Sequence, residues 1–358
     1  MQTLTASPLA RTVSETATDI WNDSCAVDEL EYAVAFGAVG ATANPTIVVD
    51  NWQKDPARWA ARVRELSAEQ PNWSERELAW GIVAEMSVRA APLLLPAFEV
   101  SGGRAGRLSV QTDPTLYRDA PAMVTQAFGF TGLAPNVIVK FPTTLAGVAA
   151  MEEASYRGIS VNATVSFSVA QAFAAAEAVQ RGIERREAEG LPTDDMGPVI
   201  TIMMGRIEDW LRVVVDRDGL VLDPAALPWS GVAVFKRAYG EWRARGFRAR
   251  LLGAAIRHQL HWSELIGGDV VITMPASWQR RFNASSVEVR PRIDDPVPYV
   301  DELRRHLPDF ERAYEPDGLS LAEFDAWGPS VRTLRAFIGS YHELLHLVTD
   351  ALLPNPDK

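Results

Sequence analysis

NVIVKFPTTLAGVAAMEEASYRGISVNATV, residues 136–165, reads as a strand, a helix and a second strand in quick succession. The apolar runs NVIVK at 136–140 and ISVNATV at 159–165 have the length of buried strands. Between them, AGVAAMEEASYRG repeats apolar residues at spacings of three and four with charges on the other face, which predicts an amphipathic helix. Strands joined through a helix pair in parallel, so this stretch predicts an α/β sheet.

The same alternation extends in both directions along the chain. Amphipathic segments such as SVAQAFAAAEAVQRGIERREAEG separate further runs of strand length, which are 18–23, 39–43, 107–112, 198–204, 250–256 and 269–274. Eight strand–helix units over about 250 residues predict a (β/α)8 barrel. An open doubly wound sheet would show the same alternation, but it usually carries a Gly-rich turn after its first strand, and this chain has none there.

Two segments fall outside this alternation. Residues 52–100, rich in Trp and Leu, predict two or three helices inserted after the second strand, and 297–353 predict helices packed outside the barrel. Neither a linker nor a repeat divides the chain. The sequence therefore predicts one domain, 1–358, folded as an α/β (β/α)8 TIM barrel with extra helices after strand 2 and at the C-terminus.

Composition limits the classes of function. A net charge of −11 argues against general nucleic-acid binding, which needs a basic face, but not against a small anion held by a few arginines. The single cysteine, Cys25, excludes an internal disulfide and a Cys-based zinc site. We see no signal peptide and no run of about 18 apolar residues, so we expect a cytoplasmic protein with no membrane partner.

Lys140 is the most conspicuous candidate for chemistry. Lysine is scarce in this chain, and the only ones are Lys54, Lys140, Lys236 and Lys358. Lys140 ends an apolar strand, so its amine is expected in the partly dry mouth of the barrel. Desolvation disfavours the charged form and lowers the pKa, which makes the amine nucleophilic. A buried ion pair with Asp23 is the alternative interpretation.

Other polar residues also close apolar runs, where a barrel places its catalytic groups. Burying such groups is costly unless they have partners or a task. Together with Lys140, the residues at predicted strand ends are Asp23, Asn44, Gln111, Asn162, Thr164, Thr201, Met203 and Arg257. These positions define the predicted site.

Several stretches, in family order from about 20 to 285, resemble the transaldolase family. Residues 136–178 carry its Lys-x-Pro-x-Thr and Gly-Ile-x-x-Asn-x-Thr patterns. The other stretches are GATANPTIVVD, GRLSVQTDPTLYRDA, MMGRIEDW and LLGAAIRHQLHWSELIGGDVVITMPAS. The longer C-terminal part and the VAVFKRAY helix look most like the long bacterial branch.

The resemblance implies roles for residues of the predicted site. Lys140 matches the lysine that forms a Schiff base with a ketose, after which the C3–C4 bond breaks to leave an enamine of dihydroxyacetone. Asp23 matches the aspartate that moves protons, and Thr164 matches the threonine that positions the catalytic water.

The remaining matches concern substrate binding. Asn44, Asn162 and Thr201 match residues that hold sugar hydroxyls, with Thr201 standing where the family has serine. Arg206 and Arg257 match the arginines that bind the substrate phosphate, which suits the forked guanidinium. The resemblance thus implies small-molecule sugar phosphates as partners, no cofactor or metal, a place in the pentose phosphate pathway, and a monomer or homodimer.

Three positions depart from the family pattern. Gln111 replaces the third-strand glutamate and can hold a water but cannot accept its proton. Met203 stands where classical transaldolases have Phe and fructose-6-phosphate aldolases, which also carry Gln on the third strand, have Tyr. Ala255 replaces a serine of the phosphate site.

Three hypotheses follow. The leading one is transaldolase-type transfer of dihydroxyacetone. A fructose-6-phosphate-aldolase-like enzyme, which releases or captures free dihydroxyacetone, is favoured by Gln111 and disfavoured by the absence of Tyr at 203. A weakly catalytic sugar-phosphate binding protein is the third, because the lysine is retained while the glutamate is missing.

Other motifs are given structural interpretations. The stretch 342–346, His-Glu-Leu-Leu-His, matches the zinc-protease pattern, but too little chain follows it for a third ligand, so we interpret it as a packing helix. His258 and His261 follow the seventh strand and could contact a ligand, but an ordinary position on a helix face is the preferred interpretation. Lys236, in a helical run, is expected to be solvated.

Overall fold

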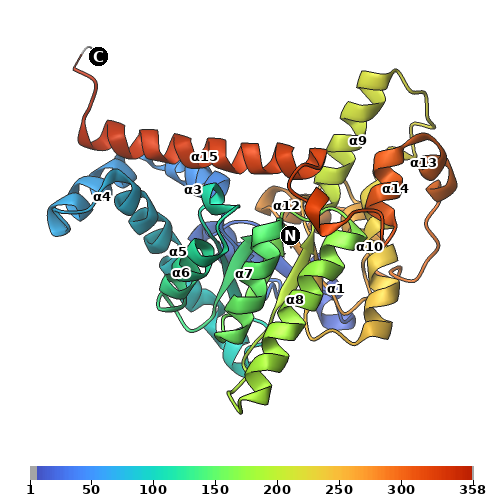
Figure 1. Cartoon of the computed structure of the whole chain (residues 1–358), viewed down its shortest axis with the longest axis horizontal. Helices are drawn as coiled ribbons and strands as arrows, with labels where there is room; N and C mark the ends of the chain where they lie inside the picture. The colour runs from blue at the N-terminus through green and yellow to red at the C-terminus, as the bar shows by residue number, and fades with distance from the viewer. Residues whose placement is uncertain (1–5, 357–358) are drawn as a thin grey trace.

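Eight short parallel strands close into a barrel in chain order in the computed structural model, which describes residues 6–356 (Figure 1). The strands are β1 (Asp19–Asn22), β2 (Gly40–Thr42), β3 (Arg107–Gln111), β4 (Val137–Pro142), β5 (Val161–Thr164), β6 (Val199–Ile202), β7 (Arg250–Gly253) and β8 (Val271–Met274). Each lies within one of the predicted apolar runs or overlaps it. The predicted (β/α)8 barrel is therefore confirmed, and the open sheet is excluded by the pairing of β1 with β8.

The strand β4 shows why these sequences form a barrel wall. All of its residues are buried, as expected for a parallel strand covered by helices on one face and by the barrel interior on the other. The register pairs Gln111 with Lys140 and Lys140 with Asn162. Because paired residues of neighbouring strands point to the same face, these three polar side chains project together from adjacent strands.

Helices that follow the strands form the outer layer. They are α2 (Val27–Val34), α6 (Ala120–Thr131), α7 (Leu145–Tyr156), α8 (Val169–Ala188), α9 (Met204–Asp218), α10 (Leu227–Arg245), α11 (Leu260–Ser263) and α12 (Ala276–Asn283). The start of α7 is fixed locally: the Thr144 side chain accepts a hydrogen bond from the Gly147 N–H at 2.9 Å. A Cβ on Gly147 would lie 1.7 Å from the Pro142 carbonyl oxygen, so glycine is required where the chain turns back from β4.

Additional helices pack around this core, as predicted. After β2 come α3 (Pro45–Lys54), α4 (Pro56–Glu69) and α5 (Glu75–Val100), and α1 (Pro8–Glu15) precedes β1. The C-terminal part forms α13 (Val300–His306), α14 (Pro308–Tyr314) and the long α15 (Gly328–Leu352). Figure 1 shows α15 lying across one end of the barrel, where it packs on α3, α4 and α5. The Thr46 and Ser340 hydroxyls, 2.9 Å apart, join α3 to α15.

The helix α5 is long and apolar enough to cross a membrane by length and composition alone. Half of its apolar window is buried within the fold, however, and the helix packs against β3, α2 and α15. These contacts give its apolar residues a structural role inside the protein.

The prediction that Lys236 is solvated is wrong. This residue lies on α10 and is 9% exposed, with its ammonium 3.2 Å from the Glu264 carboxylate. The ammonium also donates to the carbonyl oxygens of Arg292 and Asp295 at 2.7 and 3.1 Å. The helical pattern around Lys236 did not indicate burial, because the segment that covers it comes from residues beyond β8.

Candidate active site

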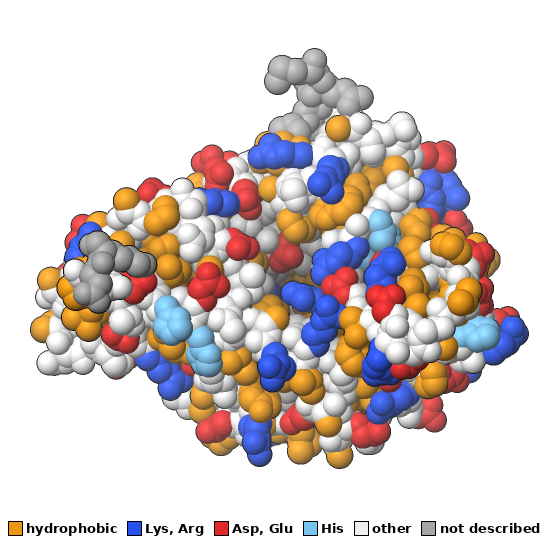
Figure 2. Space-filling view, turned by 90° about the horizontal axis from the view of Figure 1, so that it is seen from above, with side chains coloured by type: hydrophobic (Ala, Val, Ile, Leu, Met, Phe, Trp, Pro, Cys, Tyr) orange, Lys and Arg blue, Asp and Glu red, His pale blue; other side chains and the backbone are white. Residues whose placement is uncertain are grey.

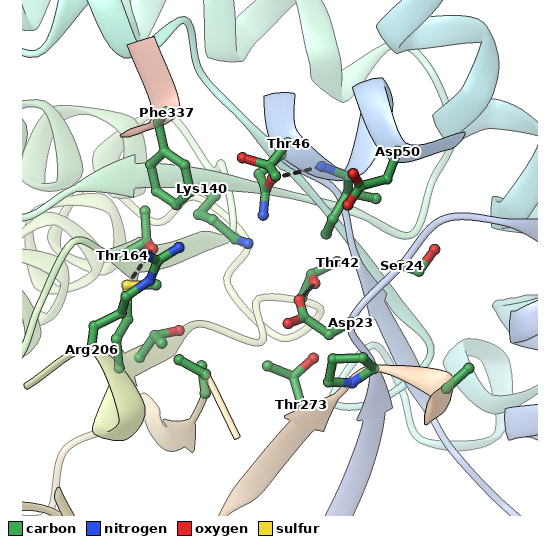
Figure 3. A pocket seen from close by; sticks show the side chains of 18 of the residues that line it. Asp23, Ser24, Thr42, Thr46, Asp50, Lys140, Thr164, Arg206, Thr273 and Phe337 are labelled. Carbon is green, nitrogen blue, oxygen red and sulfur yellow. Dashed lines mark hydrogen bonds between the residues drawn. The ribbon is translucent and has the colours of Figure 1, made fainter. Parts of the chain in front are cut away.

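A cavity of about 390 Å³ opens at the carboxyl ends of the barrel strands and is called the mouth cavity below. Its lining includes strand-end residues from around the barrel together with residues of α3, α9 and α15 (Figure 3). Among the lining residues are Asp23, Glu29, Thr42, Asn44, Asp50, Lys54, Lys140, Asn162, Thr164, Thr201, Met203, Arg206, Arg257 and Phe337. Eight of the nine residues predicted for the site therefore line one cavity, and Gln111 is the exception.

Lys140 projects from β4 into the mouth cavity, as Figure 3 shows. The residue is 7% exposed. Burial lowers the pKa of its ammonium from 10.5 to about 8, and the nearby charge of Asp23 opposes that shift. An amine with this pKa is partly neutral near pH 7 and can act as a nucleophile.

Asp23 follows β1 and faces the same cavity (Figure 3). Its carboxylate accepts a hydrogen bond of 2.5 Å from the Thr42 hydroxyl at the end of β2. Within residues 6–356, no ion pair within 4.0 Å joins Asp23 to Lys140, so the predicted alternative of a closed salt bridge does not describe this arrangement. The carboxylate is oriented by Thr42 and left accessible to a ligand in the cavity.

The two asparagines are held differently. The Asn44 side chain caps α3 by accepting from the Ile47 N–H at 3.0 Å, and its amide N–H groups have no partner among the described residues. The Asn162 amide donates to the Ser109 hydroxyl at 2.9 Å and accepts from the Thr201 hydroxyl at 2.8 Å. Asn44 thus offers free donors to a ligand, whereas Asn162 and Thr201 are already fixed to each other.

Gln111 and Thr164 occupy the wall around the lysine. Thr164, which is 2% exposed, has its hydroxyl 3.8 Å from the Met203 sulfur. Gln111 is the strand neighbour of Lys140, but it lies beneath the cavity lining and is 4% exposed. Its side-chain carbonyl oxygen is buried without a hydrogen-bond partner in the described part of the chain. A buried acceptor without a partner costs free energy, so this oxygen is a place where the fold gives up stability.

Arg206 and Arg257 line one side of the mouth cavity, and Figure 2 shows a hollow bordered on one side by Lys and Arg side chains. Arg206 lies in the first turn of α9, where the helix N-terminus adds positive potential. Burial, together with the charge of Arg257, lowers the pKa of Arg206. Arg257 donates to both carboxylate oxygens of Asp209, at 3.2 and 2.8 Å. This side of the cavity is suited to an anion.

Several lining residues were missed by sequence reasoning. Thr42 ends β2 and could have been found by the same strand-end logic. Phe337 could not, because it belongs to α15 and reaches the cavity only through the packing of α15 across the barrel (Figure 3). Asp50 and Lys54 lie on α3, and no local pattern indicates that this helix borders the mouth.

Known proteins give an independent comparison. A family model described as transaldolase/fructose-6-phosphate aldolase matches residues 20–315. A transaldolase of Thiobacillus denitrificans is 28% identical over 85% of this chain and 90% of its own length. A transaldolase of Thermobifida fusca is 29% identical over 97% of this chain and 98% of its own. A transaldolase of Neisseria meningitidis is 30% identical over 71% of this chain and 76% of its own.

Proposed function

Because this chain belongs to the transaldolase/fructose-6-phosphate aldolase family, we propose that it transfers dihydroxyacetone from a ketose phosphate to an aldose phosphate through a Schiff base on Lys140. Its relatives and its barrel make it an enzyme of carbohydrate metabolism of the transferase class. The observation that carries the finer proposal is the buried amine of Lys140, with its pKa near 8, in a cavity that also holds a carboxylate and two arginines.

The first step uses the neutral amine of Lys140. Its nitrogen attacks the C2 carbonyl of the ketose to form a carbinolamine, which loses water to give a protonated imine. The imine nitrogen can then accept an electron pair, because its positive charge makes it an electron sink. Burial supports this step by keeping part of the lysine uncharged.

Asp23 is suited to the proton transfer that accompanies carbon–carbon cleavage. Its carboxylate takes the proton of the C4 hydroxyl while the C3–C4 bond breaks, the electron pair moves toward the imine nitrogen, and an aldose leaves. The enamine of dihydroxyacetone stays on Lys140 until an acceptor aldose reverses these events. The hydrogen bond from Thr42 fixes the orientation of the Asp23 carboxylate before substrate arrives.

The opposite end of the substrate is placed by charge. Arg206 and Arg257 would bind the phosphate, the former with no competing ion pair among residues 6–356 and the latter already oriented by Asp209. Asn44 would donate its free amide hydrogens to a sugar hydroxyl. Thr201 and Asn162, joined to each other, would form a fixed wall for the hydroxyls near C1.

The proton route for imine formation is the point at which this chain differs from a classical transaldolase. Gln111 cannot take a proton from water. The carboxylates that line the cavity are Asp23, Glu29 and Asp50, and Figure 3 shows Asp50 across the cavity from Thr164. Because Glu29 is paired with Lys54 at 2.6 Å, Asp23 is the carboxylate left to serve both the imine and the cleavage steps, which predicts slow imine formation.

A second candidate is an aldolase that releases or captures free dihydroxyacetone. The observation in its favour is Gln111, whose buried carbonyl oxygen can hold a water without accepting its proton. The relative rates of two steps decide between the activities. Slow hydrolysis leaves the enamine for transfer to an aldose, as in a transaldolase, whereas slow transfer leads to release of free dihydroxyacetone, as in an aldolase. Met203, where the aldolases carry a tyrosine, argues against this candidate.

Borohydride trapping tests the proposal. The protein is incubated with fructose 6-phosphate, reduced, and digested, and the expected result is a dihydroxyacetone-sized mass on Lys140. The matched control is Lys54→Met, because Lys54 lines the same cavity but pairs with Glu29 at 2.6 Å. That variant should keep the adduct, whereas Lys140→Met should lose it.

Adding an aldose phosphate acceptor separates the three hypotheses. Adduct with transfer to the acceptor supports the transaldolase, and adduct with free dihydroxyacetone supports the aldolase. A wild-type protein that binds fructose 6-phosphate but yields no adduct would refute both and leave the binding protein.

A further inference from the structure

Two histidines and a glutamate lie together beside the mouth cavity and are called the Glu208 cluster (Glu208, His258 and His261), in which Glu208 and His261 are buried and His258 is partly buried. Glu208 comes from α9, His258 from the loop after β7, and His261 from α11. One carboxylate oxygen of Glu208 is 2.8 Å from the His258 Nε2 and 3.4 Å from the His261 Nε2. Nothing in the mechanism above uses these residues.

The cluster contacts Arg257 through the backbone. The Arg257 N–H donates to the Nδ1 of His261 at 3.2 Å. His261 is 0% exposed and Glu208 is 2% exposed, so the accepting ring and the carboxylate beside it are shielded from water. Arg257 immediately follows Ile256 and Ala255, and Ala255 has a φ of 62°, an unusual conformation for a residue other than glycine. Such a conformation persists only where the surrounding structure holds it, and Arg257 lies two residues after it.

The direction of this hydrogen bond fixes the protonation of His261. An Nδ1 that accepts from a backbone N–H carries no proton, so the neutral ring has its proton on Nε2, which faces the Glu208 carboxylate. Burial, with the charges of His258 and Arg257, also lowers the pKa of His261 well below 6.5. The ring is therefore neutral and in one tautomer, as an acceptor for the Arg257 N–H requires.

Arg257 is thus held at two places, at its guanidinium by Asp209 of α9 and at its backbone N–H by His261 of α11. Asp209 binds its guanidinium through two hydrogen bonds, at 3.2 and 2.8 Å. Glu208 faces the histidine that binds its backbone, and the second oxygen of Glu208 accepts from Arg212 at 2.5 Å. The helix that carries Arg206 at its start therefore also determines where Arg257 stands.

We propose that His261 and Glu208 are positioning residues that set the phosphate affinity of the mouth cavity by holding the backbone of Arg257. This inference rests on the proposed function for the role of Arg257. Two arginines bind one phosphate well only if the distance between them is fixed, and a small displacement of one is enough to weaken the pair.

A divalent metal is the other occupant that two histidines and a carboxylate suggest. The tautomer of His261 argues against a metal. A metal bound to the Nε2 would have to displace the proton there, and the Nδ1 carries no proton either, because it accepts from the Arg257 N–H. Histidines that bind a metal usually donate their other ring hydrogen to an acceptor, which is the reverse of this arrangement.

The experiment compares His261→Leu with His261→Asn. Leucine fills the buried space without an acceptor, whereas the asparagine side-chain oxygen can replace the Nδ1. Calorimetric titration with inorganic phosphate should show roughly tenfold weaker binding for His261→Leu and near wild-type binding for His261→Asn. Trapping of unphosphorylated dihydroxyacetone on Lys140 should proceed at the wild-type rate in both variants.

Two further variants keep the test decisive. His306→Leu, at the exposed end of α13, is the matched control and should change neither readout. If His261→Leu does not fold, Glu208→Gln removes the carboxylate while keeping its shape, and it should weaken phosphate binding in the same direction.

Specific results would overturn the inference. They are unchanged phosphate binding in His261→Leu or Glu208→Gln, no rescue by asparagine, or an equal loss of phosphate binding and dihydroxyacetone trapping. Stoichiometric zinc that survives dialysis of the wild type and is lost in His258→Ala would also overturn it. Failure of wild-type trapping would reject the proposed function alone, since phosphate titration does not depend on the Schiff base.

Discussion

Lys140 in the barrel mouth and Lys236 on the outer helix α10 are both buried lysines, yet their surroundings differ. Lys236 has a carboxylate at 3.2 Å and two carbonyl oxygens within 3.1 Å, so its three ammonium hydrogens all have acceptors. Lys140 has no such hydrogen bond within residues 6–356, and Asp23 acts on it only through its charge. Burial is common to both amines, and the partners differ.

The difference distinguishes a structural lysine from a reactive one. Burial lowers the pKa of both residues, but at Lys236 the charge and hydrogen bond of Glu264 oppose that shift. At Lys140 only the charge of Asp23 opposes the effect of desolvation, and the pKa of the amine is about 8. The same amine lines the mouth cavity, where a substrate could reach it. Removing one partner of a buried ion pair destabilises the fold, because the other charge is left buried alone. A buried amine that has no partner to begin with costs stability, but its lowered pKa makes it reactive.

The largest expected effect separates the two lysines by activity. Lys140→Met should remove the Schiff base and lower the rate of dihydroxyacetone transfer by at least about 10³-fold, because the nucleophile is gone. It should also stabilise the protein at pH 7 by on the order of 3 kcal/mol, since the charged amine no longer has to be buried. Activity assays and urea denaturation measure the two effects. A fully active Lys140→Met variant would show that this amine is not the nucleophile.

The corresponding change at Lys236, on the outer helix α10, should have the opposite effects on activity and stability. Lys236→Met leaves the buried Glu264 without its main partner and should destabilise the protein by about 3–5 kcal/mol, with the Schiff base still formed. Glu264 also has Arg292 at 3.9 Å, which offsets part of the loss. Denaturation of the double variant Lys236→Met/Glu264→Gln should recover much of the stability. If it does not, packing and not charge explains the role of this pair.

Gln111→Glu would give Lys140 a neighbouring carboxylate, as Lys236 has in Glu264, because residue 111 is paired with Lys140 on the adjacent strand. We expect imine formation to accelerate by on the order of 10²-fold, since the new group can accept a proton from water. The same carboxylate should raise the pKa of Lys140, and the pH profile should shift upward. Stopped-flow measurement of adduct formation tests both effects, with Gln126→Glu on α6 as a control outside the cavity lining.

The smallest predicted effect is the pH dependence of trapping by dihydroxyacetone. With a pKa of about 8, the neutral fraction of Lys140 rises from about a tenth at pH 7 to about nine tenths at pH 9, so the trapping rate should rise about tenfold. The folded-state pKa lies below the value of 10.5 in an unfolded chain, so stability should also increase as pH rises from 8 toward 10.5. A rate that is flat with pH, with cyanoborohydride as the reductant, would contradict the lowered pKa.

Much of the fold could be predicted because its evidence is local. The strands are three to six residues long and almost wholly buried within apolar stretches, and most of the segments between them have a helical pattern. Strand ends of a parallel barrel meet at one rim, so the sequence alone could place Asp23, Lys140 and Thr164 together. That inference needed no knowledge of which helices cover the rim.

The predictions that failed or were missing depend on contacts between distant segments. Lys236 is buried because Glu264 and the chain near Arg292 and Asp295 fold over α10. Phe337 reaches the mouth cavity because α15 packs on helices nearly 300 residues earlier in the chain, as the Thr46–Ser340 contact records.

The sequence by itself determined the alternation of strands and helices, the closure that this alternation favours, and the position of one amine at a strand end, since periodicity and order along the chain carry that information. Only the tertiary structure decided which buried charges have partners, which arginine is held by its backbone as well as its side chain, and which helix covers the mouth. The physical reason is that burial and pairing are properties of surfaces brought together by packing, and no short stretch of sequence contains both sides of such a contact.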